Sequence, residues 1–192
     1  MLPDYHLVFR QYNEQLKPLI SEIEGRLEHF SQPLLLNLAG VYDYMSIAAA
    51  EGQDSKECLE KADELVDLCI AQSYMSLIYA IRKNTDAFEK SLGKKGLRRL
   101  DNGQFVGRYL ELKMKRKELL KKARYIEERQ ALPLFKNAYE VVTEMEDMVN
   151  HGKANMSLIQ TETSSWWATA VKWILSVIIS VVAGVVVKYY LG

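Results

Sequence analysis

The sequence predicts an all-α protein: a cytosolic helical bundle of about five helices with one C-terminal transmembrane helix. Apolar residues recur at steps of three and four along most of the 192-residue chain, which is the period of an amphipathic helix. No strand-like alternation or hairpin dipeptide stands out, and the last part of the chain is almost continuously apolar. These observations divide the chain into a helical bundle over residues 1–152, a linker or helix extension over 153–165, and a transmembrane helix over 166–190.

Two helical stretches are expected in the first fifty residues. The first begins at a cap on Asp4 and ends at Phe30, and Pro18 in its middle is expected to kink or split it. The second covers residues 34–50 and carries apolar side chains on nearly every face. A helix of that kind is expected to lie at the centre of the bundle, buried from several sides.

Three further helices follow. Asp54 and Glu57 form a capping box for a long helix over residues 55–92, which Gly93 ends. After a basic connection at 94–99, a fourth helix is expected over 104–132, with Pro133 at its boundary. A fifth is expected over 134–150.

The chain is expected to work in a reducing compartment. Its first ten residues contain no signal-like apolar run, so the helical domain is expected to stay in the cytosol. Cys58 and Cys69 would lie about three turns apart on one helix, which is too far for a disulfide. Both are therefore interpreted as small buried apolar residues.

The C-terminal segment has the features of a membrane anchor. Residues 166–187 form a run of 22 residues with a single charge, and a helix of that length spans about 33 Å, close to the hydrocarbon thickness of a bilayer. Aromatic residues that favour the membrane interface stand near both ends: Trp166, Trp167, Trp173, Tyr189 and Tyr190. If Lys172 marks the edge of the hydrocarbon region, the uncharged core of the helix is only 15 residues long. A core that short favours local thinning of the bilayer or association of the helices. The alternative is a buried helix of a soluble protein.

A stripe of polar and small residues runs through this segment at every fourth position: Lys172, Ser176, Ser180, Gly184 and Lys188. Four residues turn about 400° on an ideal helix, so the stripe drifts by about 40° per step. Small residues at this spacing favour close helix association, and in a ring of many subunits the stripe would face water. The plainer interpretation is that the lysines reach the interface and the serines bond their own backbone.

The overall charge of zero hides a strong asymmetry. Residues 90–124 hold 13 lysines or arginines against three acids. Four of these bases are predicted to share one helix face: Lys113, Lys117, Lys121 and Arg124. Such a face can attract RNA, anionic lipid, or an acidic protein surface such as the run of acids at 51–67 on another subunit, or it can simply be solvated.

No catalytic or metal-binding constellation is recognisable. The three histidines, His6, His29 and His151, have no second ligand at metal-site spacing. The chain contains no glycine-rich phosphate loop and no convincing nucleophile with a base. The sequence therefore predicts a protein that is not an enzyme and needs no cofactor or metal.

An all-α domain of this size with one membrane helix resembles the small accessory membrane proteins of type VI-B CRISPR systems, which belong to a divergent HEPN-like class. The resemblance covers the architecture of the whole chain. It implies an oligomer in the bacterial inner membrane that forms pores and reinforces RNA-guided antiphage defence. HEPN nucleases carry an arginine four to six residues before a histidine, whereas here Arg26 precedes His29 by three. The resemblance therefore implies membrane perturbation and not RNA cleavage.

Two functions follow from these observations. The first is an oligomeric membrane effector, whose partners are membrane lipid and further copies of the same chain. The second is a tail-anchored adaptor that presents a helical module for binding protein or RNA at the membrane.

Overall fold

A computed structural model describes residues 5–27, 29–51 and 56–154, and within them the regular structure is entirely helical. The chain divides into two compact units, Met1–Val149 and Asn150–Gly192. The described part of the second unit, residues 150–154, is helical. The all-α class is thus confirmed for the described residues. The predicted cap at Asp4, the capping residue Asp54, most of the linker and the whole transmembrane segment lie outside them.

The first helical stretch is continuous, so Pro18 does not split it, but its geometry is irregular just before Pro18. It consists of α1 (Tyr5–Gln11), a π-helical turn η1 (Tyr12–Leu16) and α2 (Lys17–Arg26), with Pro18 in the first turn of α2. Proline has no backbone N–H to donate, and a π-helical turn is a common way to absorb such an irregularity. The predicted end at Phe30 is wrong: the helix ends at Arg26 because Leu27 adopts an extended backbone (φ −124°, ψ 137°).

Helix α3 (Gln32–Glu51) is not the centre of the bundle, which corrects the prediction for this segment. Its fully buried apolar residues are Leu34, Val41 and Ala48, which stand seven apart and form one narrow stripe. Leu38, Tyr44 and Met45 are half-buried against the same core, whereas the other apolar side chains are exposed, and Leu36 is 64% exposed. The stripe packs against α4, which approaches closely: a Cβ built at Gly40 would lie 2.9 Å from Leu65 Cδ1.

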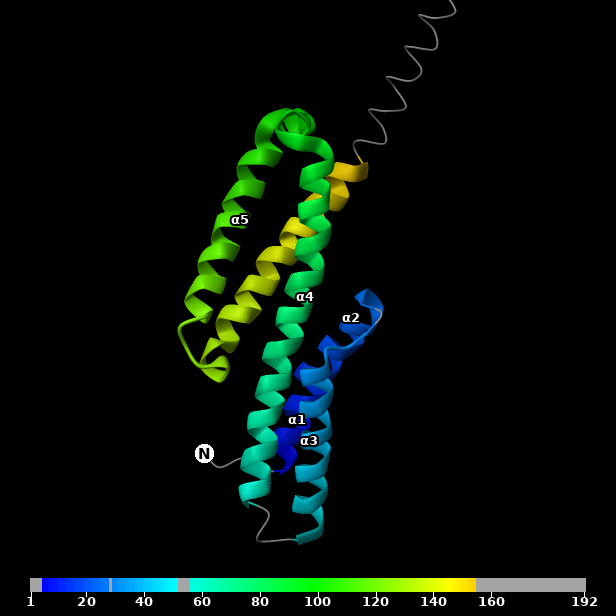
Figure 1. The fold of residues 1–192 in the computed structure, drawn as a ribbon, viewed down its shortest axis with the longest axis vertical. Helices are drawn as coiled ribbons and strands as arrows, with labels where there is room; N and C mark the ends of the chain where they lie inside the picture. The colour runs from blue at the N-terminus through cyan, green and yellow to red at the C-terminus, as the bar shows by residue number, and fades with distance from the viewer. Residues whose placement is uncertain (1–4, 28, 52–55, 155–192) are drawn as a thin grey trace, which may run out of the picture. The chain divides into compact units, whose positions relative to one another are not determined.

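The central helix is α4 (Lys56–Arg99), which runs beside α1–α3 with its first half and beside α5 and residues 128–149 with its second (Figure 1). Val66, Cys69, Ile70 and Leu77 belong to the core shared with α1–α3, whereas Ile78 and Ile81 pack with Ala138 and Val142. The sequence period predicts an inward stripe on this helix: Cys58, Ala62, Leu65, Val66, Cys69, Ser73, Leu77, Ala80, Ile81, Asn84 and Phe88. All of these are buried except Cys58 and Leu65, which are half-buried, and Asn84, which is exposed beside the buried Thr85. Cys58 and Cys69 are both free, and Cys69 is buried.

Gly93 separates two helical parts of α4, so the first part ends there as predicted. Its φ of 61° and ψ of 176° break the helical geometry, after which residues 94–99 are helical again and a 3-10 turn, η3 (Leu100–Gly103), leads into α5. The position was predicted as a helix end, and the basic stretch at 94–99 as an irregular connection. The structure confirms the break at Gly93 and shows that residues 94–99 are helical.

The boundary after α5 (Gln104–Ala123) also differs from the prediction. A turn at residues 124–127 closes the helix, with the amide of Tyr125 donating to the carbonyl of Lys122, and helical structure resumes at 128. Pro133 was expected to mark the boundary but lies inside this next helix. The sequence period predicts seven inward residues on this last helix: Phe135, Ala138, Val141, Val142, Met145, Met148 and Val149. All are buried except Met148, which is half-buried.

Candidate functional site

The four bases predicted to form one face are separated by the fold. Lys113 is half-buried and its Nζ lies 2.6 Å from Glu89 Oε2 on α4. Lys117 and Lys121 remain together on the outer side of α5, beside the exposed Leu110 and Met114. Arg124 lies just beyond the end of α5 and lines a separate groove with Tyr79 and Phe135. The single face does not form, because α5 packs on α4 along the side of Lys113 and ends before Arg124.

The acidic run at 51–67 is partly used within the chain. Arg129 lies 2.6 Å from both Asp63 and Asp67, and Glu57 pairs with Lys61 one turn away. Burial raises the pKa of the Asp67 carboxyl above its ordinary value, although Gln11 and Arg129 both act to lower it. An acidic surface for a neighbouring subunit therefore has fewer free carboxylates than the sequence suggests.

An apolar groove of about 230 Å³ runs between the N-terminal segment and α3. Phe9 is 52% exposed on one side of it and Tyr42 is 55% exposed on the other. Tyr12 and Tyr42 meet edge to face across the groove, with ring centroids 5.9 Å apart, and their hydroxyls are hydrogen-bonded. Burial and this hydrogen bond raise the pKa of Tyr12 to about 12, so the hydroxyl stays neutral. The surface is therefore uncharged and accessible. It is lined by Tyr5, Val8, Phe9, Tyr12, Val41, Tyr42, Met45, Ser46 and Ala49.

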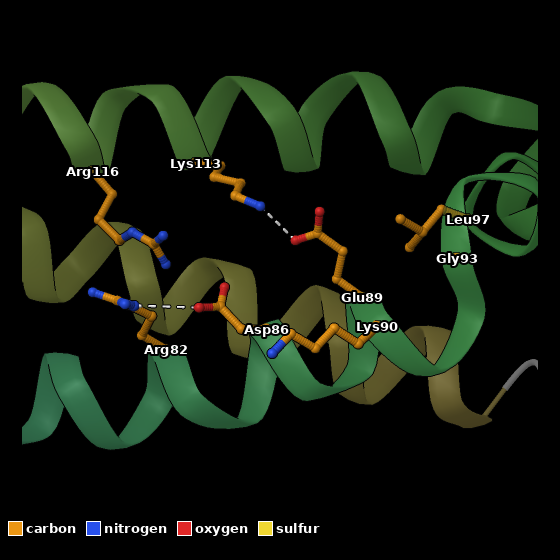
Figure 2. Close-up of a pocket in the computed structure, with 8 residues that line it drawn as sticks. All are labelled: Arg82, Asp86, Glu89, Lys90, Gly93, Leu97, Lys113 and Arg116. Atoms are coloured by element: carbon orange, nitrogen blue, oxygen red, sulfur yellow. Dashed lines mark hydrogen bonds and ion pairs between the residues drawn. The ribbon is translucent and has the colours of Figure 1, made fainter.

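A charged cleft of about 490 Å³ lies between α4 and α5 (Figure 2). Two ion pairs cross or line it: Arg82 Nε is 3.2 Å from Asp86 Oδ2, and Lys113 reaches from α5 to Glu89. The other lining residues are Lys90, Gly93, Leu97 and Arg116. The cleft thus combines four bases and two acids, and of the predicted basic face only Lys113 lines it.

Arg116 is the unusual member of this cleft. It extends from α5 into the space between the two helices, and the residue is only 7% exposed (Figure 2). Its Nη1 atom is buried and has no hydrogen-bond partner among the described residues. Burial lowers the pKa of its guanidinium, and the nearby Arg82 adds to this, whereas Asp86 opposes it. Arginine remains charged in proteins, so the cleft contains a buried cation.

Arg116 lies within the base-rich range 90–124 but is not one of the four bases predicted to share a face. The burial of Arg116 could nevertheless have been predicted from its position in the sequence. The buried residues of α5 are Phe105, Tyr109, Leu112, Arg116 and Ala123. Their spacing of three, four and seven is that of one helix face. An arginine in line with an apolar stripe predicts a buried or packed guanidinium.

The predicted membrane residues lie outside the described part of the chain. This applies to the stripe of Lys172, Ser176, Ser180, Gly184 and Lys188 and to the aromatic residues Trp166, Trp167, Trp173, Tyr189 and Tyr190. Among the described residues, one helix, Lys56–Gly93, has the length and composition to cross a membrane. More than half of its most apolar stretch is buried inside the protein, as in the core helix of a soluble domain.

Metal-ligating side chains do not gather in the described residues: no group of three or more His, Cys, Asp or Glu is placed to hold an ion there. Comparisons of the chain with protein-family models, with curated proteins and with solved structures gave no match. Function is therefore inferred from the residues and their arrangement.

Proposed function

We propose that this protein is an oligomeric membrane effector whose clustered C-terminal helices permeabilise or depolarise a membrane. The observation that carries the proposal is the segment at 166–187, with 22 residues, one charge and aromatic residues near both ends. Helices of that composition partition into lipid, and the short uncharged core favours their association.

The stripe within this segment supports a role beyond anchoring. Ser176, Ser180 and Gly184 are small enough to let neighbouring helices approach closely, and the serines can hydrogen-bond between helices. In a ring of such helices, Lys172 and Lys188 would face a water-filled interior, which is where intramembrane charges are usually found. A ring of this kind would conduct ions or small solutes.

The helical domain supports assembly. An accessible apolar surface on a folded domain commonly marks a site of protein interaction, and the groove between α1 and α3 is uncharged with large exposed side chains. In this proposal the domain brings copies together and no catalytic step is needed. The architectural resemblance to type VI-B CRISPR accessory proteins extends the proposal to the bacterial inner membrane and to antiphage defence.

The test is dye release from liposomes that contain the full chain. Replacing Ser176, Ser180 and Gly184 by leucine should abolish release, because the bulky side chains fill the stripe. The matched control replaces Ile178, Val182 and Val186 by leucine, since these residues lie about 200° away on the same helix. The control should release dye like the unmodified protein. Equal release from both variants, or no release from a confirmed oligomer, would refute the proposal.

A tail-anchored adaptor is the second candidate, and the apolar groove between α1 and α3 favours it as well, because such a groove fits a partner helix. Replacing residues 166–190 by an unrelated membrane helix separates the two functions. An adaptor should keep its activity in cells after this exchange. A membrane effector should lose both this activity and dye release.

A further inference from the structure

The charges of the cleft between α4 and α5 do not balance. Glu89 is neutralised by Lys113 and Asp86 by Arg82, at 2.6 Å and 3.2 Å respectively. Arg116 and Lys90 also line the cleft, and neither forms an ion pair with an acid in the described part of the chain. Four bases against two acids leave a net charge of +2 in a concave site.

The donors of Arg116 are also incompletely satisfied. A guanidinium carries five N–H donors in a planar fork, and Nη1 of Arg116 is buried without an acceptor in the described residues. Leaving a buried donor unpaired costs stability, and the cost is larger for a charged group. An anion in the cleft would supply both the missing acceptor and the missing charge.

The cleft has room for such a ligand. Its volume is about 490 Å³, larger than an inorganic anion needs, so a ligand can carry a further group beside the charged one. Gly93 also borders open space, because a Cβ built there would meet no other atom within 4 Å. Gly93 stands at the break in α4 and lines the cleft with Lys90 and Leu97.

We infer that this cleft binds the phosphate group of a small phosphorylated ligand, with Arg116 as its central cation and Lys90 as the second. A phosphate monoester carries a charge of about −2 at neutral pH, which matches the excess of two cations, whereas one carboxylate would leave a net positive charge. Arginine suits phosphate because its planar fork donates two parallel hydrogen bonds. None of its residues lines the apolar groove or belongs to the segment at 166–190, and the inference goes beyond the proposed membrane function.

The first experiment titrates inorganic pyrophosphate into the full chain in a zwitterionic detergent, followed by calorimetry. Arg116→Met replaces the buried guanidinium by an apolar side chain of similar length and should weaken binding about tenfold or more. Lys115→Met is the matched control, because it removes one positive charge from the adjacent, exposed position of the same helix. It should change the affinity by less than about twofold. Absence of binding to the folded protein, or equal weakening by both variants, would overturn the inference.

A second variant keeps the test decisive if Arg116→Met fails to fold. Lys90→Met alters an exposed residue that lines the cleft, so the fold should persist while pyrophosphate binding weakens at least severalfold. Unchanged affinity in Lys90→Met together with unchanged affinity in a folded Arg116→Lys would also overturn the inference.

The source of the phosphate is decided by two further probes. Glycerol 3-phosphate and monomeric dioctanoyl phosphatidic acid share a headgroup, but only the second carries acyl chains. Tighter, Arg116-dependent binding of the lipid supports the site and identifies a lipid headgroup as the ligand. Equal, Arg116-dependent binding supports it and identifies a soluble ligand. Failure of both probes to displace pyrophosphate would contradict a phosphate site.

Discussion

Replacing Ile81 by alanine tests whether α4 is the central helix. Ile81 is fully buried and packs with Ile78, Ala138 and Val142, so it joins α4 to the helix at 128–149. The substitution removes three carbons, and at about 0.8 kcal/mol each the lost transfer free energy is about 2.4 kcal/mol. The small, helix-bound Ala138 cannot move into the space, so a residual cavity should raise the cost in free energy of unfolding to about 3–4 kcal/mol.

Denaturant unfolding followed by far-ultraviolet circular dichroism measures this cost. Asn84→Ala is the control, because Asn84 lies on the same helix three residues away and is exposed. Its free energy of unfolding should change by less than about 0.5 kcal/mol. A cost below about 1 kcal/mol for Ile81→Ala, or similar costs for both variants, would refute the assignment of α4 as the central helix.

Three further predictions concern buried polar groups and backbone strain. Burial and the nearby Glu89 raise the pKa of Tyr109 from 10.0 to about 12. Because Tyr109 ionises at lower pH in the unfolded chain, the free energy of unfolding should fall as the pH rises from about 10 to about 12, by at most about 2.7 kcal/mol. Tyr109→Phe should remove most of that fall, as denaturant unfolding at several pH values would show. At neutral pH it should lower the free energy of unfolding by about 1 kcal/mol, because the hydrogen bond to the carbonyl of Thr85 is lost. Gly93→Ala should lower the free energy of unfolding by about 1–3 kcal/mol, measured by thermal unfolding, because φ of 61° with ψ of 176° is accessible almost only to glycine. An unchanged melting temperature would contradict this backbone conformation at Gly93. Arg129→Met should lower the free energy of unfolding by about 2 kcal/mol at neutral pH, because it leaves the buried Asp67 without its cation, and the loss should shrink as acid protonates Asp67. The exposed Arg108→Met is the control, and in the same assay it should cost much less than Arg129→Met at neutral pH.

The existence of the helices and their inward faces could be predicted because helical periodicity is a local property. The stripe that runs from Phe135 to Val149 repeats at steps of three and four, and every residue predicted to be inward there, apart from the half-buried Met148, is buried. An irregularity near Pro18 was equally predictable, because proline has no N–H to donate; it takes the form of a π-helical turn and does not split the helix.

The central position of α4 could not be predicted in the same way. Helix α3 is apolar on several faces, yet burial depends on which neighbours cover those faces, and only one stripe of α3 contacts α4. Helix α4 has a less apolar sequence but runs far enough before Gly93 to contact both halves of the domain (Figure 1). Length and tertiary contacts therefore outweigh the apolar content of a single helix.

The candidate cleft between α4 and α5 could likewise be predicted from the sequence only in part. The position of Arg116 on the buried stripe of α5 is visible from its spacing with Tyr109 and Leu112. The pairing of Lys113 with Glu89 is not, because the two residues stand 24 positions apart and meet only when α5 folds back on α4. A face that looks uniformly basic along one helix is therefore divided when another helix supplies the acids.

The mass of the detergent-solubilised full chain, measured by size-exclusion chromatography with light scattering, tests the proposed membrane effector most directly. The proposal requires several copies to cluster, so the protein mass should be a defined multiple of 22.1 kDa that persists on dilution. A mass of 22.1 kDa at every concentration would mean that the chain is a monomer, and clustered helices could not then account for its function.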